Sequence, residues 1–117
     1  MQTQKDLQVW QKSIKLVTEI YKTTKLFPDE EKFGLISQMR RASVSIPSNI
    51  AEGYARKNKK ENAHFVSIAY ASGTELDTQL TICKELEFLS NEKFEELEKQ
   101  LEEILKMLYS YRNYLHK

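Results

Sequence analysis

The sequence is poor in the residues that bend or cross-link a chain. It has three glycines and two prolines among 117 residues, whereas a β-sandwich or barrel needs turn residues about every 8–12 positions. A single cysteine excludes a disulfide within the chain and a cysteine-based zinc site. No apolar run approaches the roughly 18 residues that cross a bilayer. The composition therefore predicts an all-α protein with one domain, residues 1–117.

The charges are unevenly distributed although the net charge is only +1. Residues 38–60 contain one acidic residue, Glu52, and a cluster of basic residues. The cluster consists of Arg40, Arg41, Arg56, Lys57, Lys59 and Lys60. The second half of the chain is acidic. Residues 1–6 lack the apolar stretch of a secretory signal, so we expect a cytoplasmic location.

Apolar residues recur in steps of three and four at both ends of the chain, which predicts amphipathic helices. The first column is Leu7, Trp10, Ile14, Val17 and Tyr21, and the last is Phe94, Leu97, Leu101, Ile104, Leu108, Tyr111 and Leu115. We expect helices at about 6–26, 29–56, 60–89 and 91–115. Short connections make them an up-down-up-down antiparallel four-helix bundle. Pro47 predicts a kink or short break near residues 45–46 of the second helix.

The first helix carries a second apolar stripe, formed by Val9, Leu16 and Ile20. It lies about 120° around the helix from the Leu7–Tyr21 stripe. A helix wedged between two neighbours needs a wide apolar arc, which is one interpretation. The other is an interface between subunits, and we expect these three residues to be buried between chains.

No catalytic motif is evident. Glu61 and His64 have a Glu-x-x-His spacing, but a di-iron bundle needs a second such pair and further glutamates. Cys83 lies on the core-facing side of its helix and has no histidine partner, so we expect a buried structural thiol. We therefore predict neither a metal nor a cofactor, and no enzymatic activity.

A polar column follows the second helix with core-like spacing. Its members are Gln38, Arg41, Ser45, Ser48 and Glu52, with Asn49 at the edge. Such groups either satisfy one another in a buried network that fixes helix register, or contact a ligand or nucleic acid. For the network we expect an ion pair between Arg41 and Glu75 of the third helix, and a bond from Ser45 or Asn49 to a neighbouring helix.

The basic cluster permits two interpretations as well. It is either solvated surface or a site that neutralises phosphates through Arg40, Arg56, Lys57, Lys59 and Lys60. Repetition of the cluster around a symmetric oligomer would strengthen weak binding through avidity.

The sequence from Gln38 to Gly53, QMRRASVSIPSNIAEG, resembles the signature of four-helix-bundle proteins encoded in intervening sequences of bacterial 23S rRNA genes. The segments DLQVW at residues 6–10 and SGTEL at residues 72–76 support the resemblance, which covers nearly the whole chain. It implies a closed bundle that assembles into a homopentamer. The related accessory variability determinant proteins of diversity-generating retroelements share this fold and bind nucleic acid through basic surfaces.

Two hypotheses for function follow. The first is a non-enzymatic, oligomeric bundle that binds RNA or DNA through its basic surface. The second is a scaffold that binds another protein and no nucleic acid.

Overall fold

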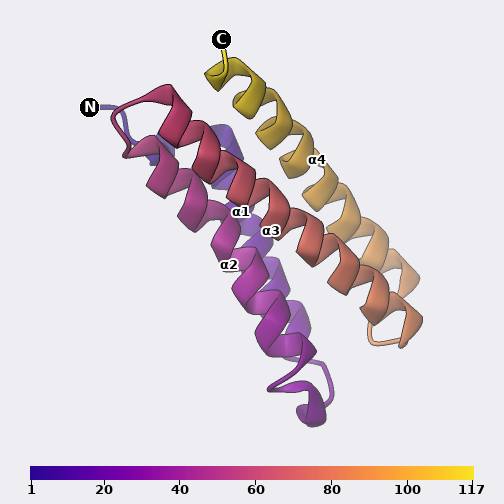
Figure 1. Ribbon diagram of the computed structural model, residues 1–117. Coiled ribbons are helices and arrows are strands. Elements are labelled where there is room, and N and C mark those ends of the chain that lie inside the picture. The colour runs from indigo at the N-terminus through magenta and orange to yellow at the C-terminus, as the bar shows by residue number, and fades with distance from the viewer.

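The computed structural model describes all of residues 1–117 and contains helices without any strand. Its four long helices are α1 (Gln8–Thr24), α2 (Leu35–Tyr54), α3 (Lys59–Glu85) and α4 (Asn91–Leu115). Two single 3₁₀ turns, η1 (Gln4–Asp6) and η2 (Asp29–Glu31), precede α1 and α2. The molecule measures 43 × 22 × 22 Å (Figure 1). The prediction of an all-α four-helix bundle is confirmed.

Each helix packs against the next, and α4 also packs against α1, so the bundle is closed. The helices alternate in direction (Figure 1). Both chain termini and the α2–α3 turn lie at one end of the bundle, while η2 and the α3–α4 turn lie at the other (Figure 1). Sequence segments far apart, such as residues 56–60 and the end of α4, are therefore close in space.

The helix boundaries lie within two residues of the predicted ones except at the start of α2 and the end of α3. α2 begins at Leu35 rather than near residue 29, because Gly34 has φ −110° and ψ −113°, which is not helical. α3 ends at Glu85 rather than near residue 89. Glu87 takes the left-handed conformation with φ 62°, and the N–H of Phe88 donates to the Cys83 carbonyl at 2.9 Å. This closing pattern satisfies a free carbonyl of the last turn.

Pro47 lies buried in the interior of α2, and the helix runs continuously from Leu35 to Tyr54. A short break near residues 45–46 therefore does not occur; the bend stays a prediction. Pro47 lacks the N–H that would bond to the carbonyl of Ser43. The helix is held on this side by packing, since Ala42, Ser43, Ile46 and Ile50 are buried.

The core consists of 21 buried apolar side chains from all four helices and their connections. The predicted column of α4 is buried except for Tyr111, which is half-buried. Cys83 is fully buried and lies 3.4 Å from the sulfur of Met39. Burial, and to a smaller extent the charge of Glu31, raises the pKa of the Cys83 thiol to about 11. The expectation of a buried structural cysteine is confirmed, and the thiol is not a nucleophile at neutral pH.

The interpretation of α1 needs correction. Val9, Leu16 and Ile20 are 5%, 0% and 0% exposed within the single chain. They point into the core and are not free to form a subunit interface. Ile14 and Tyr21, from the stripe first taken as core-facing, are each 39% exposed. The outer face of α1 therefore carries two partly exposed large apolar side chains, Ile14 and Tyr21.

Two glycines bring helices into close contact. A Cβ built on Gly53 of α2 would lie 3.0 Å from both the backbone oxygen of Asn62 and the Cβ of Phe65. A Cβ on Gly73 of α3 would lie 2.6 Å from Cδ2 of Leu105 on α4. Gly53 thus sets the distance between α2 and α3 next to the turn that joins them.

Candidate functional sites

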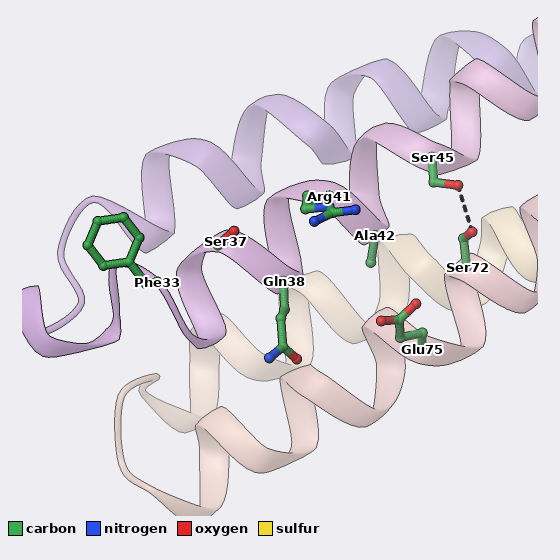
Figure 2. A pocket seen from close by; sticks show the side chains of 8 residues that line it. All are labelled: Phe33, Ser37, Gln38, Arg41, Ala42, Ser45, Ser72 and Glu75. Carbon is green, nitrogen blue, oxygen red and sulfur yellow. Dashed lines mark hydrogen bonds between the residues drawn. The ribbon is translucent and has the colours of Figure 1, made fainter.

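An open polar pocket of about 420 Å³ lies between α2 and α3 (Figure 2). It is lined by Phe33, Ser37, Gln38, Arg41, Ala42, Ser45, Ser72 and Glu75. The polar column predicted on α2 therefore faces α3, and half of it lines this pocket. Two of the three segments that carry the sequence resemblance, residues 38–53 and 72–76, meet here.

The predicted bond between helices is present at Ser45. Its hydroxyl lies 2.8 Å from the hydroxyl of Ser72 on α3 (Figure 2). The side-chain amide of Asn49 donates to the carbonyl and hydroxyl oxygens of Ser45, at 2.8 and 2.9 Å. All three residues are half-buried. This small network links the middle of α2 to the middle of α3.

The predicted ion pair between Arg41 and Glu75 is absent. Both residues are exposed, and no salt bridge joins them within 4 Å. Glu75 instead accepts a bond from the Gln79 amide at 3.2 Å, while Arg41 and Gln38 have no side-chain partner. Glu52 pairs with Arg56 on the surface at 3.2 Å. The polar column is thus a small network at Ser45 and Asn49 beside an open pocket that Gln38 and Arg41 line.

Arg40 also differs from its predicted role as a phosphate contact. Its Nε donates to Thr24 Oγ1 at 3.0 Å, and its NH2 group donates to the Tyr21 carbonyl at 3.3 Å. The guanidinium lies 4.5 Å from the centroid of the Tyr21 ring. Arg40 therefore ties α2 to α1, and its charge is engaged within the bundle.

The other four predicted phosphate contacts lie together at the α2–α3 turn. Arg56, Lys57, Lys59 and Lys60 are all exposed, and the three lysines have no acidic partner within 4 Å. We call these four residues the basic turn. The N-terminus of α3 begins within it, and the Asn58 side chain caps that helix by accepting from the Glu61 N–H at 2.9 Å. The positive end of the α3 dipole adds to the lysine charges.

Aromatic rings hold part of the basic turn in place. The Arg56 guanidinium lies 4.6 Å from the centroid of the Phe65 ring, and Lys59 Nζ lies 5.3 Å from that of Tyr114 on α4. Next to Phe65, His64 is exposed and meets its ring edge-on, with centroids 5.6 Å apart. The spacing of His64 from Glu61 indicates only a possible metal pair, and sequence reasoning gives no sign that His64 lies beside the basic turn.

The opposite end of the bundle carries charges of both signs. The η2 turn contributes Asp29, Glu30 and Glu31, while Lys22 and Lys25 lie at the end of α1. The lysines of the basic turn, in contrast, have no acidic partner within 4 Å, and they would attract an anionic ligand.

None of the helices is both long and apolar enough to span a membrane. Fold and surface together define a closed antiparallel four-helix bundle with a basic turn at one end. The chain belongs to the 23S rRNA-intervening sequence protein family, whose model matches residues 5–110. No curated protein matches it.

A solved structure supports this assignment. The chain is similar to the crystal structure of a protein of unknown function from the S23 ribosomal protein family of Bacteroides thetaiotaomicron VPI-5482. The two share 25% sequence identity with a TM-score of 0.83, over 90% of this chain and 95% of the other. The resemblance first read from residues 38–53 is confirmed at the level of the family.

Proposed function

We propose that this protein is a non-catalytic, oligomeric bundle that binds RNA or DNA through the basic turn. The observation that carries the proposal is the grouping of Lys57, Lys59 and Lys60, exposed and without acidic partners, around the N-terminus of α3. Phosphate oxygens are favoured at such a position by the lysine charges and by the positive end of the α3 dipole.

Assembly of several chains would bring together several copies of a weak binding site. One basic turn offers only a few phosphate contacts, and Arg56 already shares its charge with Glu52. Several copies in a symmetric oligomer would bind one strand with an avidity that exceeds the affinity of a single site. The homopentamer implied by the sequence resemblance would supply five copies. The exposed apolar face of α1, with Ile14 and Tyr21, supports assembly.

Salt dependence of binding tests the proposal. Affinity for a single strand should fall with salt with a log–log slope of about −0.7 per phosphate contacted. Replacement of Lys57, Lys59 and Lys60 by Gln should weaken binding by similar factors for all sequences and should reduce that slope. Fluorescence anisotropy with labelled oligonucleotides measures both quantities.

A matched control uses three lysines of the opposite end. Lys22 and Lys25 are exposed on the last turn of α1 and just beyond it, and Lys32 is exposed after η2. Their change to Gln removes the same charge without touching the basic turn. This control should bind like the wild type. Equal loss in both variants would show that only overall charge matters, and no binding at about 50 mM salt would reject the proposal.

The pocket between α2 and α3 favours a second candidate, a scaffold that binds another protein. Phe33 at its rim is 91% exposed, and the opposite charges of Arg41 and Glu75 lie unpaired with each other beside it. Large exposed aromatics are typical of protein interfaces. If this candidate is correct, Phe33→Ser should abolish capture of the partner protein while the lysine variant retains it.

A further inference from the structure

A second pocket, of about 580 Å³, opens directly beside the basic turn. It is lined by Arg56, Asn58, Lys60, Glu61, His64 and Phe65. Its volume falls within the range of roughly 300–1,000 Å³ that is usual for small-ligand sites. Because Lys60 is part of its wall, any phosphate bound at the basic turn would lie at the mouth of this pocket.

Planar groups dominate the wall of the pocket. The Arg56 guanidinium lies over one face of Phe65, at 4.6 Å from the ring centroid. His64 stands at 73° to the Phe65 ring and is exposed, so its own faces remain open to a ligand. Both arginine and histidine planes are surfaces on which unstacked nucleobases pack.

Close backbone packing places Phe65 in the pocket wall. Phe65 is half-buried, and its Cβ would lie only 3.0 Å from a Cβ on Gly53 of the facing helix. Arg56, which lies over the Phe65 ring, also pairs with Glu52 on the surface at 3.2 Å.

We propose that this pocket receives one unstacked nucleobase, so that the protein prefers single-stranded nucleic acid to a duplex. The inference rests on the proposed function, because the phosphates flanking that base lie on Lys57 and Lys60. His64 stacks on the base, and the stacked Arg56–Phe65 pair forms the other wall. A duplex keeps its bases paired and stacked, so it contacts only the lysines.

Three labelled probes, each 12 nucleotides long, separate base binding from phosphate binding. They are a single-stranded RNA, a single strand of the same length with abasic sugars, and an RNA duplex. The wild type should bind the single strand about 5- to 150-fold tighter than the abasic strand, the range expected for one stacked base. His64→Ala should remove most of that difference and leave the affinity for the abasic strand unchanged.

His116→Ala is the matched control, since His116 is the only other histidine and is exposed at the end of α4. It should behave like the wild type. Equal affinity for the single and abasic strands would overturn the base pocket while phosphate binding stands. Equal weakening of both strands by His64→Ala would also overturn it. Absence of binding to all three probes would overturn the proposed function together with this inference.

Discussion

The guanidinium of Arg40 lies 4.5 Å from the centroid of the Tyr21 ring and donates to the Thr24 hydroxyl at 3.0 Å. Thr24 in turn donates to the Ile20 carbonyl at 2.7 Å, so Arg40 completes the hydrogen bonding of a fully buried hydroxyl. The neighbouring Arg41 points about 100° away around the helix and projects into the open pocket (Figure 2). Two adjacent arginines therefore serve different purposes.

This difference predicts contrasting effects on stability. Arg40→Ala removes the bond to Thr24 and the ring contact, and should lower the free energy of unfolding by about 1–3 kcal/mol. Arg41→Ala should change it by less than about 1 kcal/mol, because Arg41 has no partner in the bundle. Urea unfolding followed by circular dichroism measures both. Comparable losses in the two variants would contradict the contacts described for Arg40.

The two buried glycines should respond differently to alanine. A methyl on Gly53 meets the backbone oxygen of Asn62, which cannot move alone, so Gly53→Ala should cost about 1–3 kcal/mol. A methyl on Gly73 meets only the end of the Leu105 side chain. The gain of about 1 kcal/mol in helix propensity offsets that contact, and Gly73→Ala should stay within about 1 kcal/mol of the wild type.

Thermal unfolding of the two variants tests the comparison. Gly53→Ala should melt several degrees below Gly73→Ala, since 1 kcal/mol shifts the midpoint by about 4–8 °C in a domain near this size. An equal midpoint would mean that α2 and α3 can separate slightly at no cost. Such a result would also weaken the case that close packing places Phe65 in the pocket wall.

The sequence predicts α4 well and α1 poorly, for a physical reason. The core column of α4 is apolar throughout, so its spacing is unmistakable. The core column of α1 includes Ser13 and Thr24, which are fully buried. Each donates its hydroxyl to a carbonyl of the preceding turn, at 2.7 Å. Hydropathy counts these residues as polar, and the wrong stripe then appears to be the core.

Spacing along one helix also predicts only part of the two candidate sites. Spacing along α2 was enough to place Ser45 opposite another helix, and Ser72 is its partner. It could not tell whether Arg41 reaches Glu75, because that depends on the width of the groove. The pocket at His64 depends on Arg56 of the α2–α3 turn folding back over Phe65 of α3, a contact that no spacing along one helix reveals.

The last prediction concerns a pair of carboxyl groups between α3 and α4. Asp77 on α3 and Glu98 on α4 each have one buried side-chain oxygen without a hydrogen-bond partner. Burial, followed by the neighbouring Asp77 and then by Glu102 and Glu95 of the same helix, raises the pKa of Glu98 to about 7. At neutral pH a large share of the folded molecules therefore carries a proton on Glu98.

The consequence is a loss of stability as pH rises. Below pH 4.5, the usual pKa, Glu98 is protonated in both folded and unfolded chains. Between about 4.5 and 7 the unfolded chain ionises Glu98 freely while the folded chain keeps the proton, so the free energy of unfolding falls. One pKa unit corresponds to about 1.4 kcal/mol, and half-burial limits the total to roughly 1–3 kcal/mol.

Glu98→Gln tests this directly, because the amide keeps the shape and cannot ionise. The free energy of unfolding of the variant minus that of the wild type should increase as pH rises and should level off above about pH 7. Glu103→Gln is the contrasting control, since its bond to Lys12 lowers the pKa of Glu103 on the same helix. The control should retain the wild-type fall between pH 4.5 and 7. If Glu98→Gln also retained it, Glu98 would not be the group that causes the loss of stability.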